Sequence, residues 1–260
     1  MSRPFAQVDV FTAEPYGGNP VAVVLDAEGL STEQMQRFAR WTNLSETTFV
    51  LPSDVADYRV RIFTPTRELP FAGHPTLGTC HAWLEAGGRG GDAIVQECEA
   101  GRIDVRRTDG GLAFAAPPLI RSGPVEEPVL AHVAALLGIA RDAMVDAAWA
   151  DNGPGWVAVL LRDADAVLAL RPGVVDLDIG VAGFAADGTL EVRAFFPPAN
   201  EDPVTGSLNA SLAQWLLETG RISAPYVARQ TSGRVHVSVA DGEIWVGGAT
   251  VTRVAGTVAL

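Results

Sequence analysis

Val60-Arg-Ile-Phe-Thr-Pro65 has a counterpart in Val192-Arg-Ala-Phe-Phe-Pro197, at an offset of 132 residues. The two stretches share Val, Arg, Phe and Pro in the same order. One residue later in register, residues 68–88 align with residues 201–221, with six identical positions. Each stretch has the pattern of a strand followed by a loop through glycine and then a helix. The echo predicts a duplicated unit, and therefore two similar α/β halves.

Segments further out support this division. Val21–Leu25 and Val157–Leu161 form a second, weaker pair of apolar strand-like runs. Ser31-Thr-Glu-Gln34 is a capping-box pattern, which predicts that a helix begins there. The proline-rich stretch that starts at Pro117-Pro118 is the expected boundary. We therefore expect an N-terminal domain of residues 1–117 and a C-terminal domain of residues 118–260.

Composition excludes several classes of partner and chemistry. The 260 residues are 48% hydrophobic and carry a formal net charge of -12 without a basic cluster, which argues against nucleic acid. The apolar runs are too short to cross a membrane, and no signal-peptide pattern opens the sequence. Cys80 and Cys98 match neither a disulfide framework nor a zinc pattern, so we expect a cytoplasmic protein. The sequence contains no lysine, which excludes a Schiff-base lysine and hence pyridoxal-phosphate chemistry.

The two loops of the echo indicate where ligands bind. His74 follows Gly73 in the first loop, and Ser207 follows Gly206 in the second. Each loop would aim the N–H groups and positive dipole end of a helix at the junction between the halves. Helix N-termini are suited to bind carboxylates, so a small anionic metabolite is the expected ligand.

Four residues form the candidate catalytic set: Glu46, His74, Asp202 and Ser207. Two carboxylates, an imidazole and a hydroxyl can together carry out proton transfer if they converge. Each also has a structural interpretation. Glu46 could be a solvated turn residue, Asp202 and Ser207 could cap a turn or helix, and His74 could be structural.

Two other chemistries are weaker. His74 and His81 could share a helix face and bind a metal, but no clustered ligand motif accompanies them, so we expect no metal. Ser207, His74 and Asp202 could form a hydrolase triad. However, Leu208-Asn209 follows Ser207, so the Gly-x-Ser-x-Gly motif of such enzymes is absent.

Four ordered motifs resemble the phenazine-biosynthesis PhzF-like isomerase family. They are Asp9-Val-Phe-Thr-Ala-Glu-Pro-Tyr-Gly-Gly-Asn-Pro-Val-Ala-Val23, Asn43-Leu-Ser-Glu-Thr47, Phe71-Ala-Gly-His-Pro-Thr-Leu-Gly78 and Glu201-Asp-Pro-Val-Thr-Gly-Ser207. The resemblance runs from about residue 7 to the last strand. It implies an α/β (α+β type) fold like that of diaminopimelate epimerase, with two pseudo-symmetric domains that each wrap a sheet around a central helix.

The family's functional residues map onto this sequence. Its proton-shuttling glutamate matches Glu46, and its site histidine, aspartate and serine match His74, Asp202 and Ser207. In the related epimerases cysteines precede the loop glycines, whereas this sequence has Ala72 and Thr205 there. Substrate-binding residues are expected at the loop positions Gly73, Thr205 and Gly206. The residues after Ser207 depart from the family's small residue and histidine, which leaves the substrate open.

The resemblance implies a cofactor-independent isomerase, a homodimer, that acts on a small carboxylate-bearing molecule. Glu46 would remove a proton from carbon and return it elsewhere on a conjugated system, while the other three residues orient the substrate. Two alternatives stay open: a racemase or epimerase of amino or hydroxy acids, and a binding protein without catalysis. The resemblance does not assign the chain to phenazine biosynthesis itself.

Overall fold

The computed structural model describes residues 1–91, 93–197 and 200–260, and the chain divides into two compact units. Unit 1 comprises Met1–Ala115 and Gly247–Leu260, and unit 2 comprises Ala116–Val246. The boundary after Ala115 lies close to the expected one. The C-terminal end differs from the expected domain 118–260, because the last strand returns to unit 1 and pairs with the first strand over almost its whole length.

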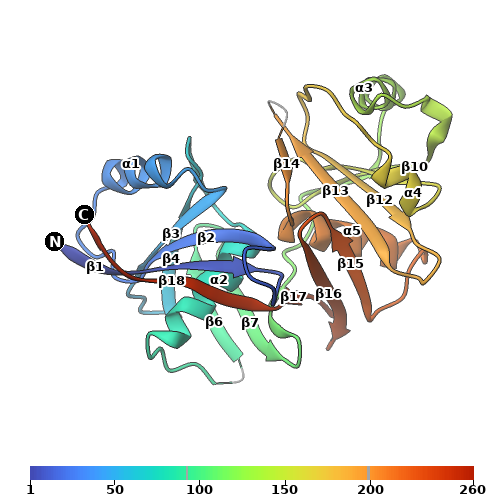
Figure 1. Ribbon diagram of the computed structural model, residues 1–260. Helices are drawn as coiled ribbons and strands as arrows, with labels where there is room; N and C mark the ends of the chain where they lie inside the picture. The colour runs from blue at the N-terminus through green and yellow to red at the C-terminus, as the bar shows by residue number, and fades with distance from the viewer. Residues whose placement is uncertain (92, 198–199) are drawn as a thin grey trace. The chain divides into compact units, whose positions relative to one another are not determined.

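Unit 1 consists mostly of strands, with two helices among them (Figure 1). In chain order they are β1 (Ser2–Val10), β2 (Asn19–Val24), α1 (Thr32–Thr42), β3 (Glu46–Leu51), β4 (Tyr58–Phe63), β5 (Glu68–Leu69), α2 (Gly73–Glu85), β6 (Ala93–Cys98), β7 (Gly101–Thr108), β8 (Gly111–Ala115) and β18 (Thr250–Ala259).

Unit 2 follows the same plan with additional short helices. Its elements are β9 (Arg121–Pro124), α3 (Glu127–Leu137), the 3-10 helix η1 (Arg141–Ala143), β10 (Met144–Asp151), β11 (Val157–Leu161), α4 (Ala164–Leu168), β12 (Ile179–Phe184), β13 (Leu190–Phe196), β14 (Asn200–Asp202), α5 (Gly206–Glu218), β15 (Tyr226–Gln230), β16 (Gly233–Ala240) and β17 (Glu243–Gly248), whose last two residues belong to unit 1.

The strand pairings of the two units agree in order and in direction. In unit 1, β1–β2 is antiparallel, β2–β3 parallel, β3–β4 antiparallel, β4–β6 parallel and β6–β7 antiparallel. In unit 2, β10–β11, β11–β12, β12–β13, β13–β15 and β15–β16 repeat this series. The equivalent strands β4 and β13 are the two stretches of the sequence echo. The structure therefore confirms the duplication and the mixed α/β class.

Each unit encloses one buried helix. Helix α2 contacts β1, β2, β3, β6, β8 and β18, and most of its residues are inaccessible to solvent. Helix α5 is buried to the same extent, and it contacts β10 and β16. A helix that is apolar on all sides is stable only inside such a layer. Figure 1 shows α2 among the strands of unit 1. The central helix expected in each domain is confirmed.

Helix α1 is partly exposed and packs one face against the sheet. Helix α1 begins with the expected capping box, in which Ser31 and Gln34 exchange hydrogen bonds. Its inner face, which includes Met35 and Phe38, packs on Phe49 of β3 in a separate apolar cluster. Among the described residues, no helix is both long and apolar enough to span a membrane.

Candidate functional site

Unit 1 brings Glu46 and His74 together. Glu46 is the first residue of β3, and the parallel pairing of β2 with β3 places it opposite Val21. His74 is the second residue of α2. The His74 Nε2 atom lies 3.3 Å from Glu46 Oε2, with side chains that are 5% and 15% exposed respectively. Glu46 is therefore not a solvated turn residue but the direct neighbour of the imidazole.

Burial decides the protonation state of this histidine. Loss of solvent lowers the pKa of His74 to about 3, although a hydrogen bond to the Pro20 carbonyl acts in the opposite direction. Nε2 makes no conventional hydrogen bond, so the bond to Pro20 comes from the other ring nitrogen. His74 is thus a neutral imidazole at physiological pH, held in one orientation by the backbone of β2.

Unit 2 holds Asp202 and Ser207 on either side of a short loop. Asp202 ends β14 and is 8% exposed, and the Thr205 hydroxyl donates a hydrogen bond of 2.6 Å to Asp202 Oδ2. Ser207 is the second residue of α5, the position that His74 occupies in α2. The Ser207 hydroxyl accepts a hydrogen bond of 3.2 Å from the Trp156 indole.

The helix starts are not capped by side chains. Neither Ala72 before α2 nor Thr205 before α5 makes a side-chain cap, so Ser207 is not an N-cap. Gly73 and Gly206 are the first helical residues and are buried. The Thr205 hydroxyl is engaged by Asp202 rather than by the helix end. Substrate contact by these loop residues stays a prediction.

Three neighbours of the candidate residues were not found from the sequence. The side-chain amide of Gln230 bonds the loop between β14 and α5, and Trp156 bonds the Ser207 hydroxyl. Asn152 donates a hydrogen bond of 2.9 Å to the Ser207 carbonyl. The sequence offers one signal for two of them, because Gly153-Pro-Gly155 lies between Asn152 and Trp156. This turn predicts a loop but does not show which residues the loop contacts.

The alternative chemistries find little support in the geometry. His81 contacts Thr250 and Glu85, and the described part of the chain contains no group of three or more residues able to hold a metal. The indole that contacts Ser207 is a pure donor and cannot take its proton, unlike the base of a hydrolase triad.

Neither cysteine carries the thiolate that cysteine catalysis requires. Cys80 and Cys98 are free and buried. Burial raises the pKa of Cys80 to about 12 and also raises the pKa of Cys98, so both remain protonated. The loop positions that carry cysteines in related epimerases are Ala72 and Thr205. The available acid–base groups are therefore the carboxylates and the imidazole.

Comparison with known proteins agrees with the sequence motifs. A family model described as phenazine biosynthesis-like protein matches residues 8–258. "Antisense-enhancing sequence 1" of Schizosaccharomyces pombe is 35% identical over 97% of both chains. The trans-2,3-dihydro-3-hydroxyanthranilate isomerase of Pseudomonas aeruginosa is 38% identical, over 80% of this chain and 78% of that protein.

Solved structures give the same result. The crystal structure of a PhzF-family phenazine biosynthesis protein from Enterococcus faecalis superposes with a TM-score of 0.82 at 27% identity, and the match covers 100% of both chains. The fold and the ordered motifs thus agree over nearly the whole sequence. This chain belongs to the PhzC–PhzF family of phenazine biosynthesis-like proteins.

Proposed function

We propose that this protein is a cofactor-independent isomerase that moves a proton within a small carboxylate-bearing metabolite. The observation that supports this most is the approach of Glu46 Oε2 to His74 Nε2, at 3.3 Å in a nearly water-free setting. A carboxyl group next to a neutral imidazole can hold and release a proton without a charged partner. The family and its named isomerases support the reaction class.

The neutral state of His74 indicates which residue carries the proton. A neutral imidazole has one N–H, and in His74 that N–H points to the Pro20 carbonyl. Nε2 is then an acceptor that faces Glu46. A proton shared by the two side chains therefore belongs to Glu46 as a carboxylic acid. His74 orients this proton and accepts its hydrogen bond.

The reaction can be written with its atoms and electrons balanced. Glu46 as a carboxylate removes a proton from one carbon, and the electron pair of the broken C–H bond enters the conjugated system of the substrate. Glu46 as a carboxylic acid then gives the proton to another carbon of that system, where the new C–H bond forms. The double bonds shift, and no oxidant, reductant or co-substrate is consumed.

Ser207 and α5 suit the carboxylate of the substrate. Because the Trp156 indole can only donate, Ser207 accepts from it and keeps its own proton for another acceptor. The uncapped first turn of α5 adds N–H groups and the positive end of the helix dipole. Asp202 in turn suits an amino or hydroxyl group of the substrate, because a carboxylate accepts hydrogen bonds.

The name of the Pseudomonas aeruginosa relative offers a first substrate. Trans-2,3-dihydro-3-hydroxyanthranilate combines a carboxylate, an amino group, a hydroxyl and ring double bonds, which are the groups that the proposed roles require. We expect a substrate of this chemical class. The compound itself serves as the probe, alongside a metabolite screen.

The test measures deuterium incorporation from heavy water. Wild type should isomerise its substrate and place deuterium at the carbon that receives the proton. Glu46→Gln should lose about two or more orders of magnitude in turnover, the range of general acid–base catalysis. Glu97→Gln makes the same change on β6, where the carboxylate contacts Ser53 and Arg59, and it should retain turnover. Near-normal isomerisation by Glu46→Gln would end the proposal.

The same experiment separates the alternatives. Deuterium confined to an α-carbon, with inversion and no double-bond shift, would identify a racemase or epimerase. Ligand binding that survives loss of both Glu46 and His74, with no turnover in wild type, would identify a binding protein.

A further inference from the structure

A network of buried polar side chains supports the loop that carries Asp202. Gln230, the last residue of β15, is 3% exposed, and Asn209 of α5 is fully buried. Together with Thr205 they surround the segment between β14 and α5. A buried polar group is costly unless its hydrogen bonds are made, so such a network is either satisfied or destabilising.

The partners of Gln230 determine how its amide is oriented. The Thr205 backbone N–H donates to Gln230 Oε1 at 3.0 Å, and Asn209 Nδ2 donates to the same oxygen at 3.1 Å. On the other side, Gln230 Nε2 donates to the Asp202 carbonyl at 3.0 Å. A backbone N–H can only donate and a carbonyl can only accept, so the reverse orientation of the amide would break both bonds.

This orientation fixes the direction of the next hydrogen bond. Gln230 Nε2 also donates to the Thr205 hydroxyl, at 2.9 Å. The hydroxyl proton is therefore directed to Asp202 Oδ2, 2.6 Å away. The donated protons therefore all point in one direction along this series of hydrogen bonds, from Gln230 through Thr205 to Asp202. The Asp202 carboxyl group at the end of this series of hydrogen bonds therefore accepts through Oδ2.

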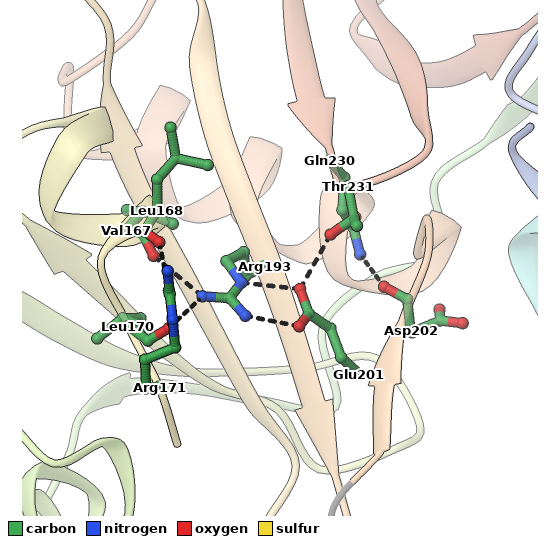
Figure 2. A network of polar contacts seen from close by, with 9 residues as sticks. All are labelled: Val167, Leu168, Leu170, Arg171, Arg193, Glu201, Asp202, Gln230 and Thr231. Atoms are coloured by element: carbon green, nitrogen blue, oxygen red, sulfur yellow. Dashed lines mark hydrogen bonds and ion pairs between the residues drawn. The ribbon is translucent and has the colours of Figure 1, made fainter.

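A second set of bonds holds the neighbouring residue of the same strand. Figure 2 shows Thr231 next to Gln230 and Glu201 next to Asp202, so that adjacent residues of the β15 end bond adjacent residues of β14. The Thr231 hydroxyl donates to Glu201 Oε1 at 2.9 Å, and the Arg193 guanidinium donates one hydrogen bond to each oxygen of the Glu201 carboxylate. The end of the short strand β14 is thereby fixed at both Glu201 and Asp202.

We propose that Gln230 is a positioning residue, which orients the Asp202 carboxylate through Thr205 so that it accepts a hydrogen bond from an amino or hydroxyl group of the substrate. This inference rests on the proposed function, in which Asp202 contacts the substrate. Gln230 itself does not contact the substrate. Its amide supplies both an acceptor and two donors, and no apolar side chain of similar size can replace them.

The test compares two variants of Gln230 in the full-length protein, with trans-2,3-dihydro-3-hydroxyanthranilate or a substrate from the screen as probe. Gln230→Leu removes every bond of the amide, and we expect kcat to fall about 10- to 100-fold while KM changes less than about threefold. Gln214→Leu makes the same substitution on α5, where the amide bonds the Pro117 and Ala210 carbonyls, and should leave kcat unchanged.

Gln230→Glu tests the direction of donation in the series of hydrogen bonds from Gln230 to Asp202. It also keeps the proposal testable if Gln230→Leu does not fold. A protonated glutamate retains an acceptor and a donor, whereas an ionised glutamate loses its donor and adds negative charge beside Asp202. The ratio of wild-type to variant kcat should therefore rise with pH. A ratio that does not change with pH, or a kcat equal to that of wild type at every pH, would overturn the proposal.

A double-mutant cycle shows whether Gln230 acts through Asp202. Residual turnover of Asp202→Asn is measured by deuterium incorporation over long incubations. In that background Gln230→Leu should cost nothing further, whereas additive losses would reveal a separate structural role and contradict the inference. If Glu46→Gln is inactive while the Gln230 variants behave like Gln214→Leu, this inference fails alone. An active Glu46→Gln instead refutes the proposed function.

Discussion

The two units share a hairpin clamp that leads into different loops. In unit 1, Arg61 bonds Glu68 through two N–H groups at 2.7 and 2.6 Å. In unit 2, Arg193 bonds Glu201 at the same two distances. Each clamp joins a long strand to the short strand before the central helix. The duplicated sequence positions have therefore kept the same bidentate geometry, which Arg and carboxylate favour.

The loops beyond the two clamps distinguish the units. In unit 1 the loop leads to a neutral histidine that faces Glu46. In unit 2 the short strand itself ends in Asp202, and Gln230 supports the loop after it. The comparison teaches that the scaffold that places a loop was retained, while the side chains on the loop diverged. In the proposed function, one unit presents the proton carrier and the other presents a fixed hydrogen-bond acceptor.

The largest expected effect concerns Glu46, the proposed proton carrier of unit 1. His74→Asn should lower kcat about 100-fold, because Glu46 loses the neutral acceptor that orients its proton. Adding Glu46→Gln should cost little more than either change alone, since residues that act as one group are not additive. His81→Asn on the same helix, a residue that contacts Thr250, should behave like wild type. Fully additive losses would mean that the two side chains act separately.

The contact between the sheet and the central helix offers a second comparison. A Cβ added to Gly78 of α2 would lie 2.3 Å from Val21 Cγ1, and one added to Gly180 of β12 would lie 2.1 Å from Leu208 Cδ1. Each change to alanine should destabilise the protein by about 1–3 kcal/mol, because overpacking forces neighbours out of their rotamers. Unfolding in urea measures this.

The residue opposite one glycine provides the control. Leu208→Ala creates space where Gly180→Ala adds volume, so the two changes together should cost less than the sum of the single costs. If the two costs were simply additive, the close contact between Gly180 and Leu208 would not determine the effect of either substitution.

The clamps themselves should differ in their effect on activity. Arg61→Met and Arg193→Met should each lower the free energy of unfolding by about 1–2 kcal/mol, since the bonded carboxylates are largely shielded from solvent. Arg193→Met should cost more, because Arg193 also donates to two backbone carbonyls. Only Arg193→Met should lower kcat, because Glu201 adjoins Asp202. Equal kcat losses in both variants would remove the functional difference between the hairpins.

Much of the fold could be predicted from local patterns, but long-range pairings could not. The echo at Val60 and Val192 correctly identified equivalent strands, because duplicated strands keep their apolar pattern. The expected second domain ran to residue 260, whereas β18 pairs with β1, with Ser2 opposite Ala259, and lies in unit 1. No pattern within a short window of sequence reveals a partner at that distance.

The site shows the same limit. Glu46 and His74 were candidates from their residue types and loop positions, the family resemblance pointed to the same two residues, and the structure brings them into contact. Gln230 and Trp156 were missed because one ends an ordinary strand and the other lies in a loop, and neither belongs to a recognisable motif. Their hydrogen bonds reach residues 25 and 51 positions away. The type of residue shows that a polar side chain can bond, but only the fold shows what it bonds to.

The smallest expected effect separates the units by pH. His74 and Ser207 hold equivalent positions in their helices, yet only His74 titrates. Its folded pKa of about 3 lies below the ordinary value of 6.5, so the unfolded chain binds more protons between these values. The stability contributed by neutral His74 is complete above pH 6.5 and is lost as the pH falls towards 3. The loss is about 1 kcal/mol for the first pH unit below 6.5.

His74→Gln should flatten the dependence of the unfolding free energy on pH in this range, whereas Ser207→Ala should leave it unchanged. An unaltered slope in His74→Gln would show that another group governs acid unfolding, and that the two helix starts do not differ in this respect.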